Sequence, residues 1–105
     1  MSLRVVEQPQ ARKDFWEIVH YLALKSVATA ERFMKAVEDS QEFLAEFPVT
    51  GTLIEDDEFG LKEIRITQVT GFENYLIVFR SRANRVEILR YTHGSRDLNS
   101  LLQGI

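Results

Sequence analysis

The chain has no cysteine among its 105 residues. Disulfide bonds, thiolate nucleophiles and cysteine-ligated zinc sites are therefore excluded. It also has no apolar run near the roughly 18 residues that cross a bilayer, no hydrophobic signal region at its start, and no repeat or linker. These absences predict a single cytoplasmic domain over residues 1–105, without a membrane as partner.

The charge is unevenly distributed along the chain. The net charge of −3 combines −6 over residues 1–60, which hold six basic and twelve acidic residues, +4 over residues 61–96, and −1 from Asp97 in the tail. The second segment is rich in arginine, whose planar guanidinium suits bidentate contact with carboxylates and phosphates. We expect any anionic partner to meet this C-terminal segment. A mixed, solvated surface is the alternative interpretation.

The N-terminal half predicts a short strand and two helices. Residues 4–7 are β-branched in the middle and stop at Pro9, which is typical of a short strand. From Gln10 the apolar residues repeat every three or four positions and predict a helix to about Lys25. A second helix, capped by Ser26 or Thr29, is expected to end at Pro48. A link of about four residues requires the two helices to form an antiparallel hairpin.

The C-terminal half predicts a sheet. Residues 61–66 alternate between apolar and polar, 75–80 form a nearly continuous apolar run, and 86–91 follow a tight turn. Residues 55–58 are four consecutive acids, predicted to be a solvated loop without metal-ligand spacing. The predicted fold is α+β, with the hairpin on one face of an antiparallel three- to four-stranded sheet and a short C-terminal tail. The opposite face, carrying Arg65, is expected to be open, and the pairing of the first strand is undetermined.

The order of elements and several motifs resemble the RelE/ParE toxin superfamily, in particular its ParE-like plasmid-stabilisation branch. The resemblance covers essentially the whole chain, and its most specific part is the segment Ile-Leu-Arg-Tyr-Thr-His-Gly-Ser-Arg-Asp at residues 88–97. The other matching positions are the run 75–80, then Ala11, Asp14, Ile18 and Tyr21, and then Ala30, Phe33, Leu44, Pro48 and Gly51.

The resemblance implies a toxin of a type II toxin–antitoxin system. Such a toxin is held inactive in a hetero-oligomer by a cognate antitoxin, here expected to be ParD-like with a ribbon-helix-helix domain. RelE-like members cleave messenger RNA in the ribosome, whereas ParE-like members act on DNA gyrase without doing chemistry. A fold of this type that serves only as a non-toxic partner or co-repressor is a third possibility.

The residues themselves bear on which branch applies. RNA cleavage needs an acid–base group and cations beside the phosphate, and Arg65, His93 and Arg96 are the candidates. The resemblance also implies a catalytic tyrosine shortly after Arg96, but residues 98–102 read Leu-Asn-Ser-Leu-Leu. The lysine pair expected before Arg65 is reduced to Lys62, and a net charge of −3 suits RNA poorly. We therefore favour a gyrase inhibitor that uses no cofactor and no metal.

Five side chains are candidates for contact with the target or the antitoxin. Four are arginines and one is the aromatic residue beside Phe15 on the first predicted helix: Arg65, Arg80, Arg90, Arg96 and Trp16. Each has a simpler structural explanation. The arginines can form surface ion pairs or lie at a strand end, His93 can cap a strand, and Trp16 can pack at the edge of the core.

Overall fold

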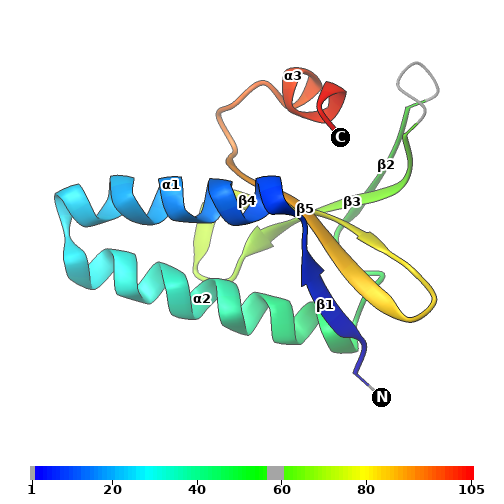
Figure 1. Cartoon of the computed structure of the whole chain (residues 1–105), viewed down its shortest axis with the longest axis horizontal. Coiled ribbons are helices and arrows are strands. Elements are labelled where there is room, and N and C mark those ends of the chain that lie inside the picture. The colour runs from blue at the N-terminus through cyan, green and yellow to red at the C-terminus, as the bar shows by residue number, and fades with distance from the viewer. Residues whose placement is uncertain (1, 57–60) are drawn as a thin grey trace.

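The computed structural model describes residues 2–56 and 61–105 and has the predicted α+β architecture (Figure 1). Two long helices form a hairpin beside the sheet, and a third, short helix lies on the other side of α1 in this view. No helix in the described part of the chain is both long enough and apolar enough to cross a membrane. The elements are β1 (Arg4–Glu7), α1 (Pro9–Lys25), α2 (Val27–Glu46), β2 (Thr52–Asp56), β3 (Leu61–Val69), β4 (Phe72–Ser81), β5 (Arg85–His93) and α3 (Leu98–Gln103).

The sheet has five strands in the order β1-β5-β4-β3-β2, so the prediction of three to four antiparallel strands was wrong. β1 pairs with β5 in parallel, and the other neighbours are antiparallel. β2 was missed because it is short and ends in acidic residues, which are rare in strands. Its backbone includes Glu55 and Asp56, predicted as loop, while Asp57 and Glu58 lie outside the described residues.

The helical hairpin has a tighter connection than predicted. Pro9 occupies the first turn of α1, where its missing N–H costs nothing. Ser26 alone separates the two helices, in an extended conformation that ends α1. Its hydroxyl accepts a hydrogen bond from the Thr29 amide at 3.2 Å, which caps α2. The connection is therefore one residue long, where about four were expected. The helices α1 and α2 are antiparallel neighbours, as predicted.

The main core lies between the hairpin and one face of the sheet. Phe33 of α2 is fully buried at its centre, with its ring 6.2 Å from that of Phe15 and 5.2 Å from that of Tyr75. The sheet contributes alternate residues of its central and neighbouring strands, namely Val69, Ile77, Phe79, Val86 and Ile88. β4 is thus a central strand covered on both faces, as its continuous apolar run predicts.

The second face of the sheet is partly covered, contrary to the expectation of an open face. The predicted tail forms α3, which Asp97 caps by accepting a hydrogen bond from the Asn99 amide. Leu101 and Leu102 of α3 pack against a smaller core of Ile64, Val78 and Leu89. The tail was predicted as irregular because a helix of six residues has little intrinsic stability, and packing onto the sheet supplies what is missing.

Candidate functional site

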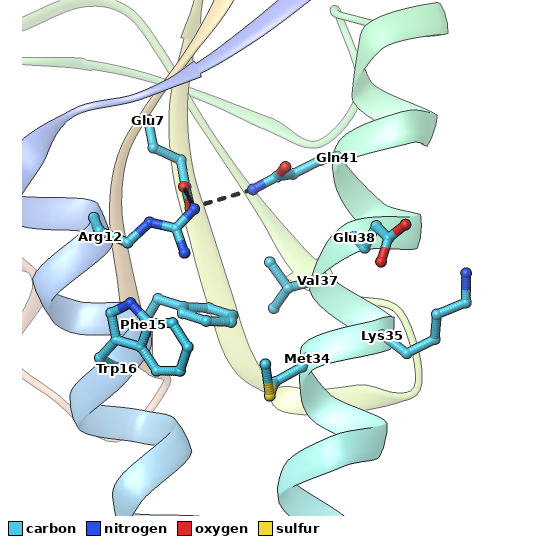
Figure 2. A pocket seen from close by; sticks show the side chains of 9 residues that line it. All are labelled: Glu7, Arg12, Phe15, Trp16, Met34, Lys35, Val37, Glu38 and Gln41. Atoms are coloured by element: carbon cyan, nitrogen blue, oxygen red, sulfur yellow. Dashed lines mark hydrogen bonds and ion pairs between the residues drawn. The ribbon is translucent and has the colours of Figure 1, made fainter.

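A groove between the two long helices holds Trp16 (Figure 2). Phe15 and Trp16 come from α1, and Met34 and Val37 face them from α2. Its volume is about 350 Å³. Trp16 is 42% exposed although its indole ring packs edge-on against Phe15, with centroids 5.1 Å apart. The groove thus presents an apolar surface that the protein itself leaves partly uncovered.

A partly buried polar network forms the end of this groove. Glu7 accepts hydrogen bonds from Arg12, from Gln41 at 3.3 Å and from the Tyr91 hydroxyl at 2.7 Å. Gln41 also donates to that hydroxyl at 2.6 Å. Burial, followed by the adjacent Glu7 carboxylate, raises the pKa of Tyr91 far above its ordinary value. Tyr91 therefore stays protonated and ties β5 to β1 and α2.

Arg90 forms an ion pair with Asp14 in the interior. Its Nε lies 2.6 Å and its Nη2 3.0 Å from the two carboxylate oxygens of Asp14, a bidentate contact. Asp14 is only 4% exposed and also accepts hydrogen bonds from the Tyr91 amide and from Gln10. The charge of Arg90 is thus matched within the fold.

Glu87 on β5 is surrounded by three arginines. It is 7% exposed, and Arg85 donates to its Oε2 from Nε at 3.1 Å and from Nη2 at 2.9 Å. The Nε of Arg82 lies 3.3 Å from the other oxygen, and that of Arg80 lies 3.4 Å from it. Burial on its own would raise the pKa of Glu87, but the hydrogen bonds from Arg85 and Arg82 lower it below its usual value. Glu87 is therefore held ionised by more positive charge than it can neutralise.

A cavity of about 530 Å³ opens beside this cluster. Arg80 and Arg82 line it together with Arg90, and Pro9, Leu89 and Ile105 supply apolar walls. The Nε of Arg80 is buried, and although it is close to Glu87 it has no hydrogen bond of acceptable geometry among the described residues. Of the predicted arginines, only Arg80 and Arg90 are thus brought together.

Arg65 lies on the helix side of the sheet, so the expectation that it sits on the opposite face was wrong. It pairs with Phe79, which belongs to the core beneath the hairpin, whereas its neighbour Ile64 belongs to the core under α3. It lies beyond the end of α2, where its Nη1 donates to the Val49 carbonyl at 3.0 Å. The positive φ of Gly51 (+87°) permits the turn there, since a Cβ would lie 2.4 Å from the Ile66 carbonyl oxygen.

His93 and Arg96 lie at the far end of β5. The Nδ1 of His93 accepts a hydrogen bond from the Ser95 amide at 3.1 Å, and its ring stands edge-on to Tyr75 at 5.1 Å. The side chain of Arg96 is exposed in the turn that follows, and its amide donates to the His93 carbonyl. Across the sheet, Arg65 is level with Ile88, five residues before His93. At about 3.3 Å per residue that is about 16 Å along the strand, so Arg65 and His93 cannot act on one phosphate.

Comparison with known proteins decides the family. The model of the ParE toxin of type II toxin–antitoxin system, parDE, matches residues 5–98. The chain belongs to the ParE toxin family. A solved structure described as a chromosomal ParDE TA system from P. aeruginosa has a similar fold, with a TM-score of 0.67 and 16% identity over 88% of this chain and 96% of that chain. No curated protein matches the sequence.

Two features of the site in this ParE-family chain were not predicted from the sequence. Glu87 and Tyr91 were not singled out as site residues, although each anchors a partly buried network. Arg85 two positions before Glu87 was a usable signal, because residues i and i+2 share a strand face. Nothing in the sequence indicated that Glu7 and Gln41 would meet Tyr91. Among residues 2–56 and 61–105, the structure brings no three His, Asp or Glu side chains into a metal-binding group.

Proposed function

We propose that this ParE-family chain is a cytoplasmic growth inhibitor that acts on DNA gyrase without catalysing a reaction and is neutralised in a hetero-oligomer by a ParD-like, ribbon-helix-helix antitoxin. The observation that carries the proposal is the family match over residues 5–98, which covers both long helices, β2 to β5 and all of β1 except Arg4. No cofactor or metal enters this proposal.

The arrangement of the candidate nuclease residues supports a binding role. A phosphate held for in-line cleavage needs its cation and its acid–base group within hydrogen-bond reach, about 3 Å. Arg65 and His93 stand about 16 Å apart along the sheet. Residues 98–103, where the catalytic tyrosine would be expected, form α3 with buried leucines. Arg65 and Arg96 are proposed as target contacts.

The groove between α1 and α2 is proposed as an antitoxin contact. Trp16 and Met34 are exposed apolar side chains on facing helices, and tryptophan is the residue type that most often anchors protein interfaces. A short apolar stretch of the antitoxin would cover them and remove apolar surface from water. Arg90 is not proposed as a contact, because Asp14 already satisfies its guanidinium.

The target is tested with purified full-length chain and DNA gyrase. We expect loss of supercoiling and accumulation of cleaved DNA in a dose-dependent manner at micromolar protein. Unchanged supercoiling would contradict the proposal. Induction in cells then separates the alternatives: cleavage of messenger RNA at ribosomes would indicate a ribonuclease, and normal growth without antitoxin would indicate a non-toxic partner.

The antitoxin contact is tested by Trp16→Ala. Growth arrest should persist, while co-expression of the antitoxin should no longer rescue growth fully and its affinity should fall at least about tenfold. Tyr21→Ala is the matched control, because Tyr21 is an exposed aromatic residue (51%) on the same helix that lines a different hollow. Equal affinities for the two variants would remove the groove from the antitoxin interface.

A further inference from the structure

The cluster around Glu87 carries a surplus of positive charge. Three guanidinium groups approach one carboxylate, so among the side chains that the structure describes two positive charges are left without a counter-charge. Arg90, close by, is matched by Asp14 and adds none. Guanidinium groups are rarely left unpaired in a partly buried place, because their five N–H groups require acceptors.

Two of these three guanidinium groups border the cavity described above. Arg80 and Arg82 both line the cavity of about 530 Å³, and the buried Nε of Arg80 lacks a hydrogen bond among the described residues. The N-terminus of α1 borders the same space, with no acidic side chain in its first turn, and its dipole adds positive potential. A cavity of this size accepts a few side chains.

We infer that this cavity is a binding site for an acidic side chain, aspartate or glutamate, of an extended peptide segment from a partner protein. The incoming carboxylate pairs with Arg80 and Arg82, and neighbouring apolar atoms of the peptide lie against Pro9, Leu89 and Ile105. The site is independent of the proposed target, because carboxylate binding can be measured without gyrase or toxicity.

A peptide suits the cavity better than a nucleic acid does. Glu87 lines the cavity and the chain as a whole carries −3, which repels a polyanionic backbone more strongly than a single carboxylate. The apolar part of the lining has no role in phosphate binding but matches aliphatic side chains. The two surplus charges are also few compared with the phosphate contacts of a typical nucleic-acid interface.

The test uses the full chain and a short fluorescent peptide of alternating leucine and glutamate, with binding followed by anisotropy. The control peptide has glutamine in place of each glutamate. We expect the acidic peptide to bind at least about tenfold more tightly than the control peptide, and Arg82→Gln to weaken it about tenfold, as for loss of one charge-assisted pair. Arg32→Gln removes the same charge from an exposed site on α2 and should change affinity less than about twofold.

The Glu87→Gln variant should change the affinity for the acidic peptide in the opposite direction from Arg82→Gln. Removing the competing carboxylate frees Arg85 as well, so the acidic peptide should bind several-fold more tightly to this variant, once thermal melting shows that it is folded. Three results would overturn the inference. The two peptides could bind with equal affinity, Arg82→Gln and Arg32→Gln could lower the affinity of the acidic peptide equally, or that peptide could bind more weakly to folded Glu87→Gln. Tighter binding of a single-stranded oligonucleotide with the same dependence on Arg82 would overturn the peptide assignment.

Discussion

Two carboxylates pair with arginines of β4, β5 and the turn between them, and they differ in the number of arginines that each receives. Asp14 receives one arginine, Arg90, in a bidentate contact, and its remaining capacity is taken by the Tyr91 amide and Gln10. Glu87 receives three arginines and leaves a buried Nε without a hydrogen bond. The first cluster is closed and joins α1 to the sheet, whereas the second is open toward a cavity. We conclude that a matched arginine stabilises this fold and a surplus one is available for binding.

The largest effect is expected when Asp14, the carboxylate of the closed cluster, is removed. Asp14→Ala leaves the guanidinium of Arg90 buried without a counter-charge, and we expect a loss of about 3–5 kcal/mol in the free energy of unfolding. Urea denaturation measures it. Asp39→Ala is the control, because its ion pair with Lys35 is exposed on α2. If Asp14→Ala were no less stable than Asp39→Ala, the closed cluster would not be structural.

A smaller effect is expected at Glu87, and it depends on pH. The pKa of Glu87 is lower in the folded protein than the usual 4.5, so its ionised form stabilises the fold above that pH. The stabilisation is lost as the pH falls through the folded pKa. Glu87→Gln should cost about 1–3 kcal/mol at pH 7, and the difference from the parent protein should shrink below 4.5. Unfolding curves at several pH values test this, and a difference constant with pH would contradict it.

The smallest effects distinguish the arginines within the open cluster. Arg85 donates twice to Glu87, so Arg85→Gln should cost about 1 kcal/mol. Arg82 is 43% exposed and donates once at 3.3 Å, so Arg82→Gln should cost less than about 0.5 kcal/mol. Thermal melts of the two variants compare them directly. A larger loss for Arg82→Gln would make it a structural residue and weaken its assignment to binding.

Much of the fold was predictable because its signals are local. The helical repeat of Ala11, Phe15, Ile18, Val19 and Leu22 and the apolar run of β4 each reflect burial of one element. The structure confirms both, with Ile18 partly buried at the edge of the core. β2 and α3 were not predicted, because each is short and is stabilised by pairing or packing with distant residues. Leu101 and Leu102 show this most clearly, since only the sheet face makes them core residues.

The sequence predicted which types of residue form the site, but not which of them contact one another. An arginine-rich C-terminal half indicated anion binding, and Arg80 does line a cavity. Which arginine is matched and which is surplus depends on contacts between residues as far apart as Asp14 and Arg90. Arg65 shows the same limit, because its face was judged from alternation along a single strand and not from the position of that strand in the sheet.

The periodicity and motifs that each segment carries alone were enough to predict the two long helices, the strands β1, β3, β4 and β5, the main core and the resemblance to the family. The contacts between distant residues exist only in the folded chain: Arg90 is paired with Asp14, Arg80 and Arg82 face a cavity, and Arg65 and His93 stand apart. An arginine carries its charge wherever it lies, but the folded chain determines whether a carboxylate is within reach.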